Sequence, residues 1–324
     1  MHPSNFTLKG MVNLCLKTNN KWITKQQSFA LLMLLYCYNL NISAQSTFFV
    51  SSNTQQAIGV FEVTTDGFIT ESTFKNITAD ADGIFYDEMT DVLYQLNRTN
   101  GAITAYNNVK ANLANDNTPS LSAMSAAETI NGREIAVSGN RLVVAQDAND
   151  ANGNQNRLIV FDISPTEITL AARYDVDFNL WGIHVDGETL YAVEDNSNRL
   201  AVFNNFFFLP DGKINPTQVI SVEGIIRTHG LTYIADRDMM LLTDVGAGSS
   251  PDDGAISVVM GFKAAAMDGN ITADEQLRIE GDATFLGNPV DIAFHAARSM
   301  IFVAERANGG GRVLNFTIPA TDGN

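Results

Sequence analysis

The stretch WGIHVDGETLYAVEDNSNRLAVF, Trp181 to Phe203, contains the pattern that decides the fold. Apolar residues alternate with other residues in three short runs, and the polar segments VDGET and DNSN separate these runs. Alternation of this kind between turn signals is typical of β-strands joined by hairpins. The stretch therefore predicts three consecutive antiparallel strands.

The same order of runs and turns starts again at Asp82, Arg133, His229 and Val290. An apolar residue stands at the equivalent place of each second run, at intervals of 49, 48, 50 and 61 residues: Leu93, Leu142, Leu190, Met240 and Ile301. A fourth run follows in most units, for example EITLAARYDV from Glu167. Four antiparallel strands per unit of this length are typical of a β-propeller blade.

Three further runs before Asp82 (TFFVSS, AIGVFEV and FITESTF) supply one more unit. The sequence thus predicts an all-β fold, a β-propeller of six blades with four antiparallel strands each. The first unit lacks its first strand, and the last unit, which ends in NFTIPATDGN, lacks its fourth. Whether the ring closes imperfectly or the natural chain continues beyond Asn324 stays open. No segment has a convincing helical period, which argues against α/β folds.

Residues 1–44 have the composition of a secretory signal. Four lysines and no acidic residue precede the apolar run FALLMLLYCY, Phe29 to Tyr38, and small residues follow it. This order predicts cleavage after Ala44 and a secreted or periplasmic protein. The apolar run is too short to span a bilayer, so no stable membrane span is expected in the mature form. Residues 45–324 form the predicted single propeller domain, which contains neither of the two cysteines.

The chain is strongly acidic. It has 36 Asp and Glu against 20 Lys and Arg, a net charge of −16, and removal of the signal takes away only basic charge. Such a surface repels polyanions, so nucleic acids and anionic membranes are not expected partners. Cations are the expected counter-species.

The opening stretch resembles an NHL repeat, a propeller blade with a defined order of Gly, Leu-Tyr, Asp, Asn-x-Arg and Val-Phe. The matching residues are Gly182, Leu190, Tyr191, Asp195, Asn198, Arg199, Val202 and Phe203. The resemblance implies the propeller fold, and the other units keep parts of the pattern. Related propellers include binding platforms, lyases and lactonases, so the fold does not choose among these functions.

In a propeller, the start of each first strand and the end of each second strand lie on one face, around a central tunnel. We call this face the tunnel mouth. The predicted ligand-binding residues there are Asp82, Arg133, Trp181, Glu194, His229, Asp244, Asp291 and Glu305. Rigidly held loops are common binding sites, so we expect an exported binding or interaction module for an unidentified protein, glycan or small molecule. The alternative is that these residues only satisfy strand ends and turns.

A second resemblance supports an alternative function. DGIFYDEMTDVLY, from Asp82, resembles the Pro-Asp-Gly motif of gluconolactonase-type propellers, in which the Asp binds a divalent metal and acts as acid or base. THGLTY resembles their Asn-Gly-Leu metal motif, with His229 in place of Asn. The resemblance implies a metal-dependent lactonase-like hydrolase or lyase with Asp82 as catalytic residue.

Calcium or another divalent cation is the candidate cofactor. The segment DANDANGNQN, which includes Asp147 and Asp150, has the composition of a calcium loop but lacks EF-hand spacing, and a solvated hairpin is the alternative. The candidate metal ligands are Asp82, His229, Asp147 and Asp150. His184 is expected in the core, and the run NNFFFLPDG from Asn204 is expected to be buried between neighbouring blades.

Overall fold

The computed structural model describes residues 46–52, 57–63, 69–75, 80–115, 119–248, 250–307 and 311–319. The predicted signal, residues 1–44, lies outside the described residues. The chain divides into two units, one formed by 1–46 with 62–70 and a larger unit formed by 47–61 with 71–324. The described residues of the smaller unit are strand residues. None of the helices in the described ranges is long and apolar enough to cross a membrane.

The described strands form six sheets. The first contains β1 (Ser46–Ser52), β2 (Ala57–Val63) and β3 (Ile69–Lys75). The second contains β4 (Ala81–Asp87), β5 (Val92–Asn97), β6 (Ile103–Asn107) and β7 (Ser120–Met124). The third contains β8 (Gly132–Ser138), β9 (Arg141–Gln146), β10 (Arg157–Ser164), β11 (Glu167–Asp175) and the short β15 (Gly212–Lys213).

The fourth sheet contains β12 (Leu180–Asp186), β13 (Thr189–Glu194), β14 (Arg199–Phe203), β16 (Gln218–Val222) and the short β20 (Asn270–Ile271). The fifth contains β17 (Thr228–Ile234), β18 (Met239–Asp244), β19 (Ala255–Met260) and β21 (Leu277–Glu280). The sixth contains β22 (Pro289–His295), β23 (Met300–Glu305) and β24 (Arg312–Thr317). Short helical segments include α3 (Val109–Leu113), α4 (Phe262–Ala265), η1 (Asp150–Asn152), η2 (Phe206–Phe208), η3 (Ala235–Arg237), η4 (Ala273–Glu275), η5 (Asp282–Thr284) and η6 (Ala296–Arg298).

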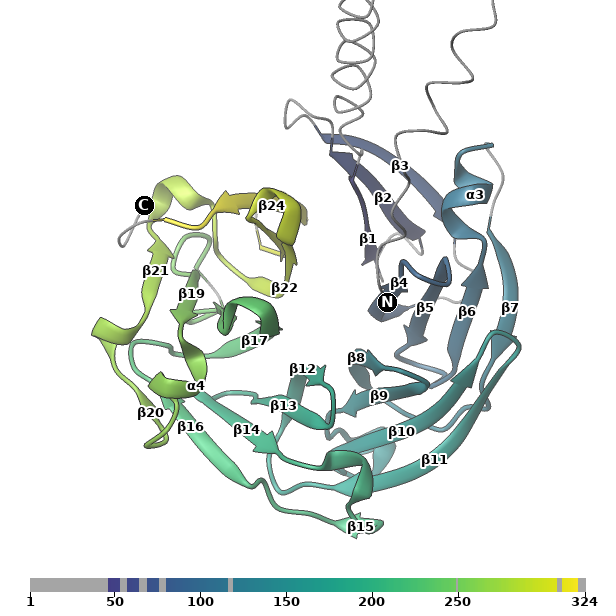
Figure 1. The fold of residues 1–324 in the computed structure, drawn as a ribbon, viewed down its shortest axis with the longest axis horizontal. Coiled ribbons are helices and arrows are strands. Elements are labelled where there is room, and N and C mark those ends of the chain that lie inside the picture. Colours follow the sequence, from purple (N-terminus) through teal and green to yellow (C-terminus); the bar gives the residue numbers. More distant parts are fainter. Residues whose placement is uncertain are drawn as a thin grey trace, which may run out of the picture. The chain divides into compact units, whose positions relative to one another are not determined.

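In the larger unit the sheets surround a centre lined by β4, β8, β12, β17 and β22, as Figure 1 shows. Each of these inner strands contacts the next one in chain order from β4 to β22. This arrangement is a β-propeller, and the prediction of an all-β propeller fold is confirmed. The last sheet has the three strands that the sequence predicts.

The prediction of six blades is wrong, because the structure has five. Five sheets lie entirely within the larger unit, whereas the sheet of β1, β2 and β3 is divided between the two units. The sequence gives the physical reason. The repeat that contains β1, β2 and β3 has no inner strand, so it cannot build a complete blade. Its contact with the last sheet is aromatic, because the Phe48 ring centroid lies 4.5 Å from that of Phe302.

The core lies between neighbouring sheets. Phe206 is fully buried, with its ring edge-on to Tyr174 at 5.0 Å, while Phe207 packs at the border of the same cluster and Phe208 is 72% exposed. Burial between blades is therefore confirmed for the start of the Phe run. His184 lies edge-on to Tyr233 at 6.5 Å, and burial lowers the pKa of His184 to about 4, as expected for a packed histidine.

Short helical segments follow three of the third strands, and the sequence pattern did not predict them. In each, one residue has a positive φ: Asn108, Asn205 and Gly261, at 51°, 52° and 63°. The next residue is a buried apolar anchor: Val109, Phe206 and Phe262. Asn and Gly tolerate this left-handed conformation best. Segments of three to five residues are too short to show a helical period.

The inner strands approach each other closely at glycines. A Cβ atom on Gly230 of β17 would lie 2.6 Å from Asp291 Cα of β22, and one on Gly182 of β12 would lie 2.3 Å from His229 O. Such contacts leave no room for a side chain. Gly83 of β4 approaches the backbone of β8 in the same way, so three inner strands have a glycine at the point of close approach.

We therefore expect Gly230→Ala to lower the free energy of unfolding by roughly 1–3 kcal/mol, because β17 and β22 must separate to admit the methyl group. Gly261→Asn is the matched control: Gly261 has open space around it, and Asn already occupies the equivalent position 205. Urea unfolding followed by circular dichroism measures both variants. Equal stability of Gly230→Ala and the unmodified chain would contradict the close-approach argument.

Candidate functional site

Each inner strand contains one extra residue where it begins. In β12, Leu180 pairs with Glu194 and Ile183 pairs with Ala192, so two residues oppose Val193 alone. The same irregularity occurs in β4, β8, β17 and β22. A β-bulge re-aims side chains and is common next to functional sites. The bulges hold the residues that the sequence places at the tunnel mouth: Asp82, Arg133, Trp181, His229 and Val290.

Three of the predicted mouth residues form a stack. The rings of Trp181 and His229 are parallel, with centroids 3.8 Å apart and an interplanar angle of 1°. The guanidinium carbon of Arg133 lies 4.2 Å from the centroid of the Trp181 ring, which is a cation–π contact. Because β12 lies between β8 and β17, the indole receives one neighbour from each adjacent blade.

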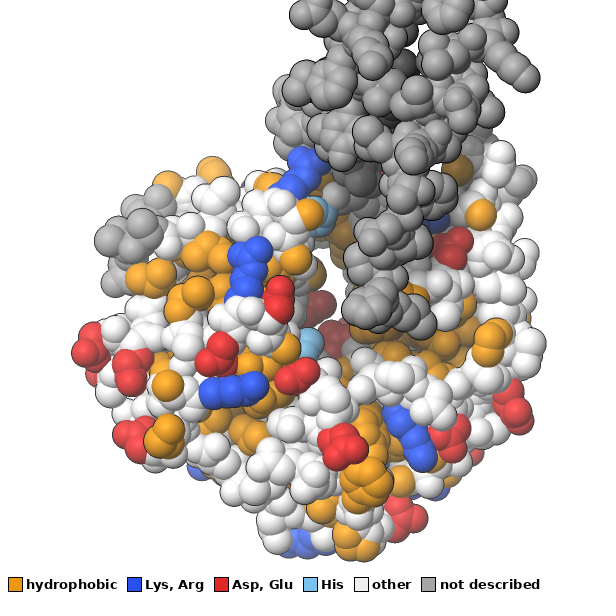
Figure 2. All heavy atoms as spheres, in the orientation of Figure 1, with side chains coloured by type: hydrophobic (Ala, Val, Ile, Leu, Met, Phe, Trp, Pro, Cys, Tyr) orange, Lys and Arg blue, Asp and Glu red, His pale blue; other side chains and the backbone are white. Residues whose placement is uncertain are grey.

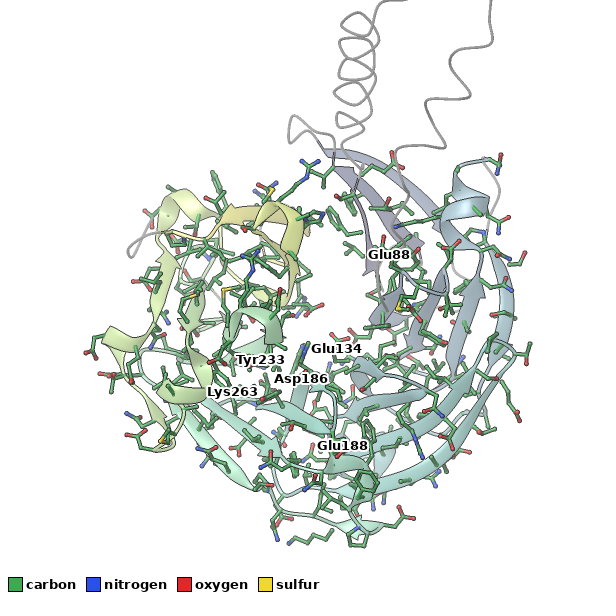
Figure 3. All side chains as sticks on the ribbon, in the orientation of Figure 1. Glu88, Glu134, Asp186, Glu188, Tyr233 and Lys263 are labelled. Carbon is green, nitrogen blue, oxygen red and sulfur yellow. The ribbon has the colours of Figure 1, made fainter. Side chains whose placement is uncertain are left out.

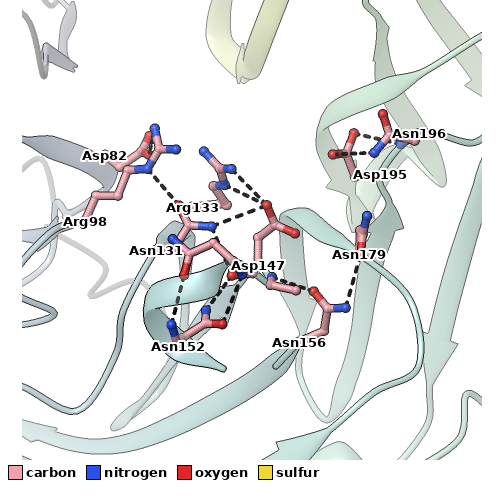
Figure 4. A network of polar contacts seen from close by, with 12 residues as sticks. Asp82, Arg98, Asn131, Arg133, Asp147, Asn152, Asn156, Asn179, Asp195 and Asn196 are labelled. Atoms are coloured by element: carbon pink, nitrogen blue, oxygen red, sulfur yellow. Dashed lines mark hydrogen bonds and ion pairs between the residues drawn. The ribbon is translucent and has the colours of Figure 1, made fainter. Parts of the chain in front are cut away.

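Each end of the stack meets a carboxylate. Arg133 Nη2 lies 2.8 Å from Asp147 Oδ2, as Figure 4 shows. At the other end, His229 Nε2 lies 3.2 Å from Asp195 Oδ1. Arg227 Nε also donates to Asp195 Oδ1, at 3.0 Å. Burial by itself would raise the pKa of Asp195, but the bonds from His229 and Arg227 lower it to about 2. Burial lowers the pKa of His229, so its ring is neutral at neutral pH.

Three carboxylates from three blades form the second part of the site: Asp82 on β4, Glu134 on β8 and Asp291 on β22. Figure 3 shows Glu134 at the centre of the larger unit, and Figure 2 shows acidic side chains inside the central hollow. Burial raises the pKa of Asp82 to about 7 and that of Asp291 to about 6. Burial and the charge of Asp291 hold the pKa of Glu134 well above its ordinary value. Asp291 also raises the pKa of Asp82, so the carboxylates repel one another.

The guanidinium groups near these carboxylates neutralise them incompletely. Arg98 Nη1 lies 3.7 Å from Asp82 Oδ2, and the Asp82 side chain remains 28% exposed. Arg98 Nε donates to Asn131 Oδ1 at 3.0 Å, and Arg133 is already paired with Asp147. Both guanidinium groups lower the pKa of Asp82, but less than burial raises it.

The predicted ligand residues at the ends of second strands have structural contacts. Asp244 Oδ1 accepts from the backbone N–H groups of Ile226, Arg227 and Gly246. The Glu305 carboxylate accepts from those of Gly287, Asn288 and Ala307. The buried Glu194 lies 2.6 Å from Arg199 Nη2. Asp244 and Glu305 thus hold the loops that precede β17 and β22, whereas Glu194 pairs within its own blade. The role of these carboxylates in ligand binding stays a prediction.

The candidate metal ligands lie on different elements. Asp82 belongs to β4, His229 to β17, and Asp147 is paired with Arg133. Asp150 belongs to η1, where Asn149 and Asn152 cap each other's backbone. Within the described ranges, no three His, Cys, Asp or Glu side chains are arranged as a metal-binding group. The divalent-cation hypothesis stays a prediction.

Sequence reasoning missed Arg98, Asp195 and Arg227. Arg98 and Asp195 each come directly after the last residue of a second strand, as Asp147 does. The sequence prediction selected the last strand residue itself, which faces the loops. The residue directly after the end of the second strand could have indicated the site, because it is charged in three successive blades.

No family model and no curated protein matches the chain. Solved structures do match. A chain in the crystal structure of a nidogen/laminin complex is 12% identical with a TM-score of 0.55, and the match covers 84% of this chain and 93% of that one. A putative 6-phosphogluconolactonase from Bacteroides uniformis is 14% identical with a TM-score of 0.54, covering 88% and 78%. A protein of unknown function from Desulfotomaculum acetoxidans is 10% identical with a TM-score of 0.55, covering 80% and 73%. At these identities the likeness shows the propeller fold alone.

The ion pair of Asp195 with Arg227 and its contact with His229 predict an acid-sensitive contribution to stability. Because its folded pKa of about 2 lies below the ordinary 3.8, the contribution is present above pH 4 and is lost as the pH falls toward 2. Asp195→Asn is expected to lower the free energy of unfolding at pH 7 by about 2 kcal/mol and to flatten its dependence on pH in this window. Urea titrations from pH 2 to pH 7 measure this, with the exposed Asp236→Asn as control. A parallel pH dependence in Asp195→Asn and the unmodified chain would refute the assignment.

Proposed function

We propose that the chain is an exported β-propeller binding module, and that the tunnel mouth binds a ligand with positive charge. The observation that carries the proposal is the group Asp82, Glu134 and Asp291, whose carboxylates come from three blades. The charge of Asp291 raises the pKa of both Asp82 and Glu134. A cation bound between these carboxylates would supply the positive charge that the nearby guanidinium groups provide only in part. The acidic composition and the NHL-like pattern around Trp181 support a binding role of this kind.

The stack beside the carboxylates favours a binding surface that is already formed without ligand. Arg133, Trp181 and His229 are fixed by ring contacts, by the ion pair of Arg133 with Asp147 and by the contact of His229 with Asp195. A preformed surface loses little conformational entropy on binding, which favours affinity. The carboxylates, in contrast, must lose protons to bind a cation, so binding is coupled to pH.

We expect the affinity for a small organic dication, with 1,4-diaminobutane as the probe, to rise at least tenfold between pH 5.5 and pH 7.5. The pKa values of about 7 for Asp82 and about 6 for Asp291 place deprotonation in this window. Asp82→Asn should weaken binding at pH 7.5 at least tenfold. Isothermal titration calorimetry in two buffers of different ionisation enthalpy also measures the protons released.

The control is Glu188→Gln, an exposed carboxylate on the hairpin between β12 and β13, which lies at the opposite end of β12 from the bulge. It should bind the probe as the unmodified chain does. If calcium binds in place of the diamine with the same dependence on Asp82, the ligand is an inorganic cation, as the gluconolactonase resemblance implies. Absence of binding by either cation, or binding that is indifferent to Asp82, would reject the tunnel mouth as a cation site.

One observation favours the second candidate function, a lactonase-like hydrolase or lyase. A carboxyl group with a pKa of about 7 has nearly ideal proton affinity for a general acid or base at neutral pH, and Asp82 has this value. If the chain is such an enzyme, it hydrolyses a δ-lactone, and Asp82→Asn abolishes turnover while Glu188→Gln retains it. A binding module shows the diamine or calcium affinity without lactone turnover. The two assays on the same three proteins therefore separate the candidates.

A further inference from the structure

The loops that lead into the inner strands carry exposed apolar side chains. Ile130 stands two residues before β8 and is 39% exposed, and Ile226 stands two residues before β17 and is 65% exposed. Phe178 has the same place before β12 and is partly buried. Single exposed apolar residues are ordinary on a protein surface, but these recur at one position of the repeat in three successive blades.

Backbone hydrogen bonds hold the two exposed isoleucines in place. The N–H of Ile130 donates to Gln146 Oε1 at 2.9 Å, and the N–H of Ile226 donates to Asp244 Oδ1 at 3.1 Å. Gln146 and Asp244 are the last residues of the second strands β9 and β18. The polar side chain at the end of a second strand therefore fixes the apolar residue of the loop that enters the same blade.

The last blade presents an apolar side chain from a different position. The equivalent residue before β22 is Gly287, whose N–H donates to Glu305 Oε2 at 3.0 Å. A Cβ atom on Gly287 would lie 2.6 Å from the backbone of Pro251, so no side chain fits there. Phe285 is 55% exposed and has a φ of 59°. A left-handed conformation is unusual for a bulky residue and marks a candidate functional position.

These apolar residues lie on the same face as the stack and the carboxylates. Each loop connects the fourth strand of one blade with the inner strand of the next, and the inner strands begin at the tunnel mouth. We call the four residues the apolar rim: Ile130, Phe178, Ile226 and Phe285. The first three each stand three residues before one member of the stack. The same repeat therefore places the stack at the mouth and the apolar rim in the loops that approach it.

We propose that the tunnel mouth binds a polypeptide segment that presents a lysine side chain between apolar residues. This inference rests on the proposed cation site and names the class of its ligand. An ammonium group has three N–H donors, and carboxylates approach the centre from three blades on Asp82, Glu134 and Asp291. The flexible aliphatic stem of lysine lets the backbone of the segment stay at the apolar rim while the charge enters the hollow.

The apolar rim favours a polypeptide over a smaller ligand. A free metal ion or a small diamine contacts the carboxylates alone, so the exposed side chains of the rim contribute nothing to its binding. Protein interfaces combine a centre rich in Trp and Arg with surrounding contacts that exclude water, and Trp181 and Arg133 already form such a centre. Covering Ile226 and Phe285 removes apolar surface from water, which contributes to affinity. A neutral glycan supplies neither the positive charge nor the apolar side chains.

Two matched peptides test the proposal. Acetyl-Leu-Lys-Leu-amide and acetyl-Ser-Lys-Ser-amide have the same charge and differ only in the side chains that flank the lysine. Isothermal titration calorimetry of the full chain at pH 7.5 should show at least tenfold tighter binding of the leucine peptide. Asp82→Asn should weaken the binding of both peptides at least tenfold, because both place the ammonium group among the carboxylates.

Variants of the apolar rim identify the surface that contacts the leucines. Ile226→Thr combined with Phe285→Asn should reduce the ratio of the two affinities at least fivefold. Threonine keeps the β-branched shape of isoleucine, and asparagine tolerates the left-handed conformation, so the fold is retained. Met89→Ser is the matched control, because Met89 is 96% exposed on the hairpin at the opposite end of β4 from the bulge. It should leave the ratio unchanged.

The possible failures are distinguishable. If 1,4-diaminobutane binds in dependence on Asp82 but the two peptides bind equally, the polypeptide inference is overturned and the cation site stands. Tight binding of the leucine peptide to Asp82→Asn overturns the inference as well, because the lysine charge is then not recognised. Absence of binding by the diamine, calcium and both peptides rejects the cation site and the inference together.

Discussion

The close approach of inner-strand backbones is the constraint on which the rest of the larger unit depends. At Gly83, Gly182 and Gly230, the next inner strand lies so near that a Cβ atom would come within 2.8 Å of its backbone. Interiors packed to this density resist any added atom. The absence of a side chain at these three positions therefore lets neighbouring blades converge on a narrow centre, and the large apolar clusters between the sheets follow from that convergence.

The same constraint explains the charges of the site. An extra residue beside the point of close approach directs a side chain toward the central hollow, where protein surrounds it. Charged groups in that position are stabilised when they find a partner, as Arg133 does in Asp147. Asp82 and Asp291 have higher pKa values in the folded protein than their ordinary value of 3.8. These two groups therefore lower the free energy of unfolding increasingly as the pH rises from about 4 toward 7. Retaining such groups costs stability, which is a feature of binding and catalytic sites.

Much of the fold could be predicted from local patterns, and the reasons are physical. Alternation between turns requires only neighbouring residues, so the strands and hairpins around Leu190 and Tyr191 were predictable. The number of blades depends on whether the first three strands complete a blade, which local alternation does not determine. The left-handed residues Asn108 and Asn205 lie in segments too short for a periodic signal, although each is followed by a buried anchor.

The candidate site was predictable only in part, because its contacts join residues of different blades. The bulge residue Trp181 was selected from its place in the repeat, but its stacking on His229 depends on the register between β12 and β17. Asp195 shows the limit most clearly. It follows the second strand of one blade and meets His229 of the next, so its role depends on how adjacent blades pack. A repeat pattern gives each position within a blade, whereas the chemistry of this site is produced between blades, where the sequence pattern carries no direct signal.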